Sequence, residues 1–531
     1  MYAKKRATLV FNYFSAPTNQ FIKIFIMKRF YYFLVFFGLG SATVKANVTP
    51  NALFSNNAVF QRNVVVPVWG TAEKGEKVSV EFAGQKVNTV AANGQWMIQL
   101  KPLKAGGPYE LTIKGSNTVT FINILVGEVW ICSGQSNMER QLGLRSPQKP
   151  ILNWEGEVAA ANYNQIREFT VGRNPSSIPV KDLTGQWVIC DSKTVKSFTA
   201  IGYFFGSELY KKLKVPIGLI NSSWGGTAAE KWTSRHAMEA NPQLKSLVEA
   251  YDKAVNNFPD SLQKYKKNES ALLVKWAADT VSEKLKNKGI PRKPSAPIDP
   301  QKTGDCGGLF NGMIYPLIPY AIKGVIWYQG ETNSGRAKQY SILFPSLISD
   351  WRSCWSIGNF PFLFVQLAPY RGNSADLREA QLLTWKKTPN TSMVVTLDCG
   401  DSNDVHPANK RPVGERLALA ARALAYGEKK LEYSGPVYES FKIEQDKVVI
   451  YFTHTGGGLV AKDGLLKGFK ISYDNKKFFD AKAEIKGNTI LVYNNDSKVP
   501  KAVRYAFDSY ANGNLFNQEG LPASPFRTDT D

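Results

Sequence analysis

A near-continuous apolar run, Ile124 to Cys132, leads into a glycine-bearing turn and constrains the fold of this chain more than any other feature. A strand that is apolar on both faces is typical of a parallel sheet covered by helices on both sides. Similar runs recur at Ile217 to Asn221, Gly324 to Tyr328, Phe362 to Leu367 and Met393 to Leu397. Helical patterns lie between several of these runs, so the alternation predicts a three-layer α/β domain with a mostly parallel sheet.

The expected helices between the runs cover Ile201 to Leu213, Ala375 to Lys386 and Ala408 to Tyr426. Residues 236–303 interrupt the alternation. Apolar residues at helical spacing between Leu244 and Val255 predict one amphipathic helix, and a second is expected from about Ser270 to Leu285. We interpret this stretch as a helical insertion that could form a lid or rim beside a functional site.

Two further regions have the pattern of antiparallel β structure. In residues 47–122, short alternating segments are separated by turns such as Asn93-Gly94, which predicts a small β-sandwich. From about Gly435 the chain is β-rich again, as a second module or the returning half of the first. The expected organisation is an export signal with an upstream segment (1–46), a β-sandwich (47–122), the α/β domain (123–430) and a C-terminal β-rich domain (431–531).

The N-terminus has the pattern of a signal peptide. Basic residues at Lys28 and Arg29 precede an apolar run, Phe30 to Leu39, and small residues follow up to Ala46. The run is too short for a membrane span. We expect cleavage after Ala46, no integral membrane span in the mature chain, and a periplasmic or extracellular location; Met27 could be the true start.

The net charge and the cysteine content limit the kinds of partner and site that this chain can have. The net charge of +22 falls to +15 without residues 1–46, which hold seven basic and no acidic residues. The remaining excess is dispersed and accompanies no nucleic-acid motif, so a solvated basic surface is expected and no nucleic-acid partner. The five cysteines form no C-x-x-C pair, which disfavours a zinc or redox site. An exported chain could pair some of them, and at least one stays unpaired within the chain. The sequence does not indicate an oligomeric state.

Four polar segments follow apolar runs of the α/β region. They are Gly134 to Met138, Asn221 to Thr227, Trp327 to Asn333 and Asp401 to Pro407. Ligands in open α/β sheets bind at the carboxyl ends of the strands, so we expect these segments to meet in space.

A serine nucleophile and a histidine base are the chemistry that these segments favour. Ser136 lies on a tight strand-to-helix turn, and His406 is the one histidine of three, with His236 and His454, in a strand-end loop beside carboxylates. The base needs an acceptor that orients it. Asp404 is the preferred acceptor; Asp401, the Asn403 side chain and a backbone carbonyl are alternatives.

The predicted oxyanion donors are the backbone N–H groups of Ser136 and Gly226, with the side chain of Gln329 or Asn333. Gln135 and Glu331 are expected at the substrate, where Glu331 would orient the backbone or a neighbour. No metal and no cofactor is required by this chemistry.

In combination the segments resemble the conserved blocks of SGNH-type hydrolases, in particular the sialate O-acetylesterase family. The matching motifs are Gly-Gln-Ser-Asn-Met (134–138), Gly-Gly-Thr (225–227), Trp-Tyr-Gln-Gly-Glu (327–331), Asp-x-His-Pro (404–407) and the ending at 520–527. The resemblance implies a flavodoxin-like catalytic domain with β-sandwich modules and the removal of O-acetyl groups from sialic acids or related sugars. Many SGNH enzymes have Asp three residues before the His, where this chain has Asn403, so a Ser–His dyad held by a backbone carbonyl is an alternative.

Three rival functions are compatible with the sequence. An esterase acting on acetylated xylan or another polysaccharide would use the same chemistry. A non-catalytic carbohydrate-binding protein would use the β modules and exposed aromatic residues. A glycosidase would need two suitably spaced carboxylates, and Glu331 with Asp404 could be interpreted in that way.

Overall fold

The computed structural model describes residues 47–285 and 290–529, and the structural statements below concern these residues. The predicted signal segment, residues 1–46, lies outside them. Among the helices of the described part, none is long and apolar enough to cross a lipid bilayer. All five cysteines lie within it, and each is unpaired.

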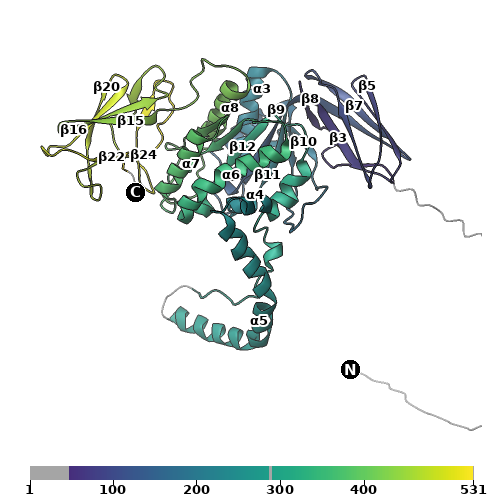
Figure 1. The fold of residues 1–531 in the computed structure, drawn as a ribbon, viewed down its shortest axis with the longest axis horizontal. Helices are drawn as coiled ribbons and strands as arrows, with labels where there is room; N and C mark the ends of the chain where they lie inside the picture. The colour runs from purple at the N-terminus through teal and green to yellow at the C-terminus, as the bar shows by residue number, and fades with distance from the viewer. Residues whose placement is uncertain (1–46, 286–289, 530–531) are drawn as a thin grey trace, which may run out of the picture. The chain divides into compact units, whose positions relative to one another are not determined.

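A mostly parallel sheet forms the centre of the protein, and this confirms the predicted α/β class (Figure 1). Its edge strand β10 is antiparallel to β9, and the other neighbours run parallel. The strand order is β10 (Trp187–Asp191), β9 (Asn162–Thr170), β11 (Ile217–Ser223), β8 (Thr118–Gly134), β12 (Gly324–Tyr328), β13 (Phe362–Val365) and β14 (Thr391–Val394).

Helices cover both faces of this sheet. Trp327 of β12 pairs in register with Ser133 of β8, so these two side chains point to one face and Trp130 of β8 points to the other. Trp130 contacts Phe205 of α3 (Ala200–Leu213), whereas Trp327 stacks on Phe344 of α6 (Ala337–Trp355). Helix α8 (Arg411–Ala425) packs beside α3, and α7 (Ala375–Lys387) packs beside α6. The result is three layers.

Strand β8 belongs to two sheets. Its first part pairs antiparallel with β7 (Gly106–Lys114), and its last seven residues pair in parallel with β11. It therefore runs without a break through the boundary expected at residues 122 and 123. The N-terminal sheets are completed by β2 (Val59–Gln61), which pairs with β8, by β4 (Lys77–Phe82) and β5 (Gln85–Val90), and by a separate sheet of β1 (Thr49–Pro50), β3 (Val66–Thr71) and β6 (Gln95–Leu100).

The C-terminal region is β-rich, as its alternating pattern predicts. Two four-stranded sheets and one two-stranded sheet form it. The first contains β15 (Val437–Glu444), β16 (Lys447–Thr453), β21 (Thr489–Tyr493) and β20 (Lys482–Lys486). The second contains β19 (Phe478–Asp480), β18 (Phe469–Ser472), β22 (Ala502–Tyr505) and β24 (Phe526–Arg527), and the small one pairs β17 (Leu459–Ala461) with β23 (Leu515–Asn517).

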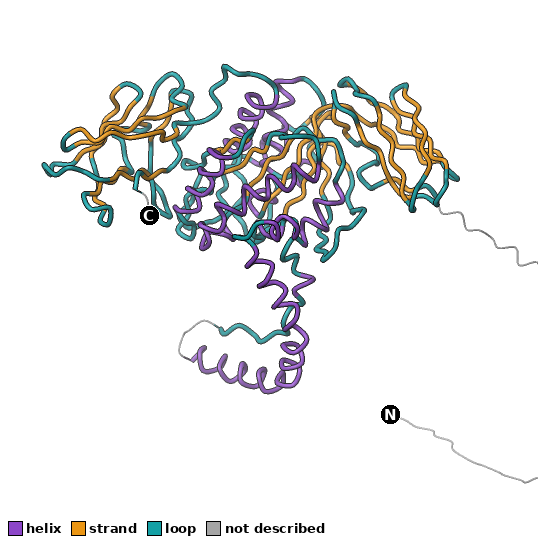
Figure 2. Tube along the Cα trace, in the orientation of Figure 1, coloured by secondary structure: helices purple, strands orange, loops and turns teal. Residues whose placement is uncertain are grey.

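The helical insertion differs from its prediction. After α4 (Arg235–Ala240) comes one helix of 41 residues, α5 (Lys245–Leu285), where the sequence predicts two shorter ones. Pro259 lies inside it, although proline removes one helical hydrogen bond. No residue from Tyr251 to Glu283 is buried, and Figure 2 shows the helix extending away from the sheet and bending. The lid or rim role stays a prediction.

Candidate active site

The turn after β8 sets the position of Ser136. Gly134 has φ +132°, and a Cβ there would lie 2.2 Å from the carbonyl oxygen of Tyr328, so only glycine allows this close approach to β12. The Gln135 N–H donates to the same carbonyl oxygen at 2.9 Å. Ser136 then begins the short helix α1 (Ser136–Glu139) at the carboxyl end of the sheet.

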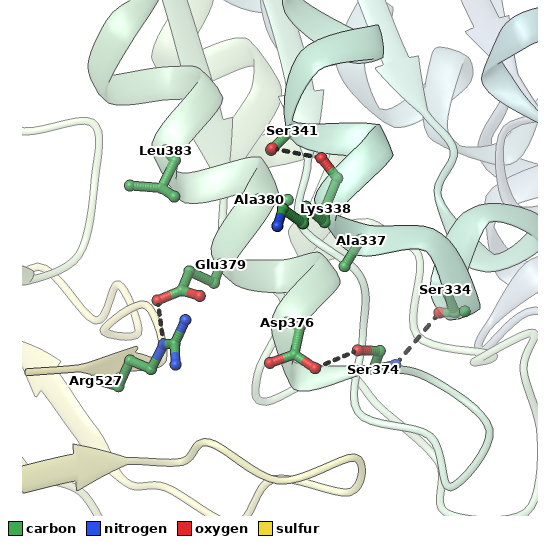
Figure 3. Close-up of a pocket in the computed structure, with 11 residues that line it drawn as sticks. Ser334, Ala337, Lys338, Ser341, Ser374, Asp376, Glu379, Ala380, Leu383 and Arg527 are labelled. Carbon is green, nitrogen blue, oxygen red and sulfur yellow. Dashed lines mark hydrogen bonds and ion pairs between the residues drawn. The ribbon is translucent and has the colours of Figure 1, made fainter. Parts of the chain in front are cut away.

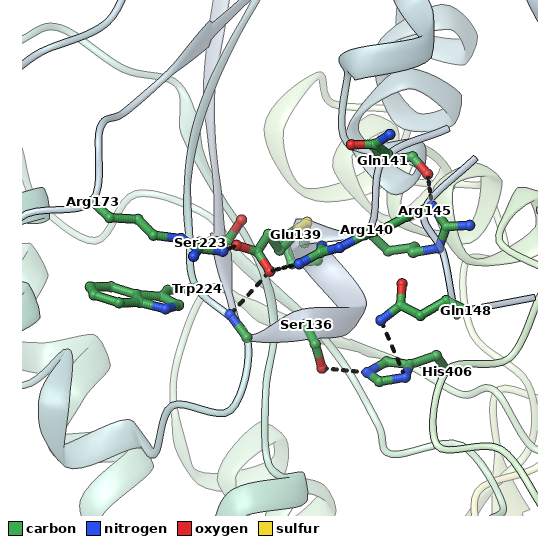
Figure 4. A network of polar contacts seen from close by, with 12 residues as sticks. Ser136, Glu139, Arg140, Gln141, Arg145, Gln148, Arg173, Ser223, Trp224 and His406 are labelled. Carbon is green, nitrogen blue, oxygen red and sulfur yellow. Dashed lines mark hydrogen bonds and ion pairs between the residues drawn. The ribbon is translucent and has the colours of Figure 1, made fainter. Parts of the chain in front are cut away.

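His406 lies directly against this serine. Its Nε2 is 2.8 Å from Ser136 Oγ, although the two residues are 270 positions apart in the chain. Figure 4 shows the imidazole ring pointing at the hydroxyl group. The structure thus brings together the predicted nucleophile and the predicted base.

The predicted acid, Asp404, is placed beside the histidine backbone. Its Oδ1 accepts the backbone N–H of His406 at 2.8 Å, but the same oxygen is 3.8 Å from the ring Nδ1, beyond hydrogen-bond range. Asp401 forms an ion pair with Lys149 and accepts the backbone N–H of Asn403 at 2.9 Å. A residue absent from the sequence prediction, Gln148, is nearer to the ring, with Nε2 3.5 Å from Nδ1.

The surroundings of His406 favour its neutral, basic form. Burial lowers the pKa of the imidazole, and the charge of Lys410 lowers it further, whereas the Asp404 carboxylate acts in the opposite direction. Burial also lowers the pKa of the Lys410 ammonium, to about 7.

A buried network beneath the pair joins three strand ends. Asn137 Nδ2 donates to Glu331 Oε1 at 2.6 Å and to the Val405 carbonyl oxygen at 3.0 Å, and Asn137 Oδ1 accepts from Lys410 Nζ. Burial raises the pKa of the Glu331 carboxyl. The structure therefore places Glu331, predicted at the substrate, among inward-facing polar groups that hold the His406 loop. The sequence assigns no role to Asn137 or Lys410, because only the fold shows that the Lys410 ammonium is buried and contacts the Asn137 side chain.

The side chain of Gln135, the other residue predicted at the substrate, links two turns. Gln135 is buried, and its Oε1 accepts the backbone N–H groups of Gly330 and Thr332 at 3.4 and 3.3 Å. These bonds connect the turn after β8 with the turn after β12. Its position is that of a brace between the two turns.

The two side-chain amides predicted as oxyanion donors are engaged with protein groups. Gln329 Nε2 donates to the Thr227 carbonyl oxygen at 3.2 Å and to Asn333 Oδ1 at 2.7 Å, and Asn333 Nδ2 donates to Glu230 at 3.0 Å. Gly226, in contrast, has φ +73° on an exposed turn, and a Cβ there would meet no atom within 4 Å. The open backbone of this turn is therefore the more accessible of the predicted donors.

A charged and aromatic cluster adjoins Ser136, and the sequence pattern did not indicate it. Glu139 accepts from Arg145 at 3.1 Å, from Arg173, and from the backbone N–H of Gly225 at 3.2 Å. The Arg173 guanidinium lies 5.1 Å from the centre of the Trp224 ring. A Cβ on Gly225 would be 3.2 Å from the Ser136 Cβ, so the cluster is immediately beside the serine (Figure 4).

A separate cavity of about 720 Å³ lies where α6 and α7 meet strand β24 (Figure 3). Its walls carry the ion pair of Glu379 and Arg527, 2.8 Å apart, and the Ser374 hydroxyl, which donates to Asp376 at 3.4 Å. Neither Ser136 nor His406 lines it. The pair formed by Ser136 and His406 is thus on a different part of the surface.

Comparisons with known proteins point in one direction. Residues 126–288 and 313–423 match the family model described as "Carbohydrate esterase, sialic acid-specific acetylesterase". The sialate O-acetylesterase of Rattus norvegicus is 32% identical over 426 residues, covering 71% of this chain and 73% of its own. The human sialate O-acetylesterase is 31% identical over 447 residues, covering 75% of each chain. The crystal structure of a carbohydrate acetylesterase from Xanthomonas citri, 35% identical, covers 91% of this chain and all of its own, with a TM-score of 0.75.

Proposed function

We propose, from the premise that this chain belongs to the carbohydrate esterase family of sialic acid-specific acetylesterases, that it removes O-acetyl groups from sialic acids. Membership makes it an esterase, and the similar solved carbohydrate acetylesterase supports an acetylated carbohydrate as the substrate class. The observation that carries the proposed mechanism is the 2.8 Å separation of Ser136 Oγ and His406 Nε2.

The proposed reaction is a two-step acyl transfer. His406 Nε2 takes the Ser136 hydroxyl proton while Oγ attacks the acetyl carbonyl carbon, and the same proton is then given to the departing sugar oxygen. Water deprotonated by His406 hydrolyses the acetyl-serine. The backbone N–H groups of Ser136 and Gly226 are the proposed oxyanion donors, each worth about 3–4 kcal/mol of barrier. The side-chain amide of Gln329 or Asn333 could act as a further oxyanion donor only if it gave up one of its present hydrogen bonds to the protein.

The cluster beside Ser136 supports an anionic sugar as substrate. Arg145 and Arg173 share the single carboxylate of Glu139, which leaves one positive charge in excess next to the Trp224 ring. Sialic acids carry a carboxylate on a sugar ring, and an aromatic face with a nearby cation suits both parts. A variant Arg173→Gln is therefore expected to raise KM for O-acetylated sialic acid and to leave neutral acetylxylan unaffected.

Two further features belong to the proposal. The strand order β9-β11-β8-β12-β13-β14 with helices on both faces supports a flavodoxin-like, SGNH-type catalytic domain, and the flanking antiparallel sheets support β-sandwich modules. The charged start, apolar run and small residues up to Ala46 support export to the periplasm or outside the cell. N-terminal sequencing of exported protein checks this, and a mature chain that retains Phe33 contradicts it.

Acetate release from O-acetylated sialic acid and from acetylated xylan tests the substrate, with Ser136→Ala as the inactive control. Faster release from sialic acid supports the proposal. Faster release from xylan favours a polysaccharide acetyl esterase. The similar solved structure from Xanthomonas citri is described only as a carbohydrate acetylesterase, which is compatible with that alternative. Sugar binding without acetate release, and without labelling of Ser136 by a serine-directed phosphonate, would indicate an inert binding protein. A glycoside product with its acetyl group intact would indicate a glycosidase.

A further inference from the structure

The proton on Nδ1 of the His406 ring needs a hydrogen-bond acceptor, and the predicted acid, Asp404, does not provide one. To accept the Ser136 proton at Nε2, the neutral ring must carry its own proton on Nδ1. That N–H requires an acceptor, because the ring otherwise turns or adopts the other tautomer. Asp404 Oδ1 is 3.8 Å from Nδ1, which is too far for a hydrogen bond, and it already accepts the His406 backbone N–H.

Gln148 has an unsatisfied acceptor at this position. Its Nε2 is 3.5 Å from His406 Nδ1, and within the described residues its Oε1 is buried without a hydrogen-bond partner. Figure 4 shows the amide facing the ring on the side opposite Ser136. The two ends of a glutamine amide have the same shape, and a half-turn about the last side-chain bond exchanges them. After that exchange Oε1 lies about 3.5 Å from Nδ1, at the limit of hydrogen-bond range, and a small shift of the side chain lets it accept the Nδ1 proton.

The loop that carries Gln148 is fixed at both sides. The buried Arg140, which follows α1, donates to the carbonyl oxygens of Gln141 at 2.7 Å, Gly143 at 2.9 Å and Lys149 at 3.0 Å. Lys149 also forms an ion pair with Asp401, which belongs to the segment that carries His406. The loop is thus attached to the segment of the nucleophile and to the segment of the base, and its glutamine is held between them.

We propose that Gln148 is the positioning residue of the catalytic base: its side-chain carbonyl accepts the Nδ1 proton of His406 and so fixes the tautomer and the ring orientation. The inference rests on the proposed function. It assigns to a neutral amide the contact that a carboxylate makes in a Ser-His-Asp triad. The charged groups that act on the pKa of the ring are Lys410, Asp404, Arg145 and Arg140, and Gln148 adds no charge to them.

Two substitutions and one control test the proposal. Gln148→Leu keeps the volume but removes the acceptor, and kcat on aryl acetates is expected to fall roughly 10- to 100-fold with KM nearly unchanged. Gln148→Glu restores an acceptor and adds a negative charge. It is expected to keep most of kcat and to move the acidic limb of the kcat/KM profile to higher pH, because the charge raises the pKa of His406. The control is Gln141→Leu in the same loop, which removes a hydrogen bond to the Leu144 carbonyl oxygen at 2.7 Å. It is expected to keep the wild-type kcat and the wild-type pH dependence of kcat/KM.

The outcomes separate this inference from the proposed function. Wild-type kcat in a folded Gln148→Leu variant, or a Gln148→Glu variant whose acidic limb does not move, overturns the role of Gln148. If Gln148→Leu does not fold, the position of the acidic limb in the kcat/KM profile of Gln148→Glu decides the role of Gln148 alone. An active wild type with inactive Ser136→Ala and unaffected Gln148 variants refutes only this inference. A wild type that neither releases acetate nor reacts with a serine-directed phosphonate refutes the proposed function itself.

Discussion

Two histidines of this protein lie beside carboxylates, and their surroundings differ in an instructive way. His454, after β16 in the C-terminal region, has Nδ1 2.8 Å from Glu432 Oε1 and its ring 5.6 Å from that of Trp385. His406 has the poorer carboxylate contact, at 3.8 Å, but its Nε2 meets Ser136 at 2.8 Å. A close histidine–carboxylate pair therefore does not by itself distinguish the proposed site. His406 is distinguished by its contact with the Ser136 hydroxyl group, in the turn after β8.

The largest expected effect comes from removing that hydroxyl group. Ser136→Ala is expected to lower kcat on an aryl acetate by roughly 10³-fold or more, since no acyl-enzyme can form. Initial rates of acetate release measure it, with a thermal melt to show that the variant is folded. Turnover close to that of the wild type would mean that Ser136 is not the nucleophile.

Exchanging each histidine in turn tests the comparison directly. His406→Asn is expected to lower kcat by roughly 10³-fold, because the serine loses its base. His454→Phe keeps an aromatic ring but removes the hydrogen bond to Glu432, so it is expected to lower the melting temperature and leave kcat unchanged. The comparison would break if the C-terminal variant lost activity at a normal melting temperature.

A smaller effect is expected when the carboxylate beside His406 is neutralised. Asp404→Asn keeps an oxygen for the His406 backbone N–H, so kcat/KM is expected to fall by less than roughly tenfold. The acidic limb should move to lower pH, because the lost negative charge had raised the pKa of His406. A thousandfold loss in the pH-rate profile would instead assign Asp404 the role of triad acid.

The smallest effect concerns the unmodified enzyme. The proposed base, His406, accepts a proton only in its neutral form, so kcat/KM is expected to fall as the pH drops through the pKa of His406. Burial and the Lys410 charge lower that pKa, and the acidic limb is therefore expected below pH 6.5. A profile with its limb at pH 7 or above, recorded on an acetate ester with a pH-independent leaving group, would contradict this.

The sequence predicted the strands that are apolar on both faces, but it did not predict β9. That strand carries Arg167 and Glu168, which are buried. Arg167 Nη1 donates to the Asn123 carbonyl oxygen, and Glu168 accepts the Thr199 backbone N–H. Such partners exist only after folding, so a hydrophobic pattern cannot reveal the strand.

The same distinction applies to the site. Ser136 and His406 could be proposed because turns at the carboxyl ends of parallel strands converge. Gln148 could not, because it lies in an irregular loop, 258 residues from the histidine it faces. The apolar spacing predicted two helices in the insertion because it is interrupted between Val255 and Ser270, but α5 continues through that stretch, including the exposed Pro259.

Strand β8 has a mechanical consequence. One unbroken strand is hydrogen-bonded into an N-terminal sheet at its start and into the central sheet at its end, so no flexible linker separates the two sheets. Continuous hydrogen-bonded backbone therefore sets the position of Ser136 relative to the N-terminal sheets. A substitution that destabilises those sheets is expected to displace the serine, although they lie outside the site.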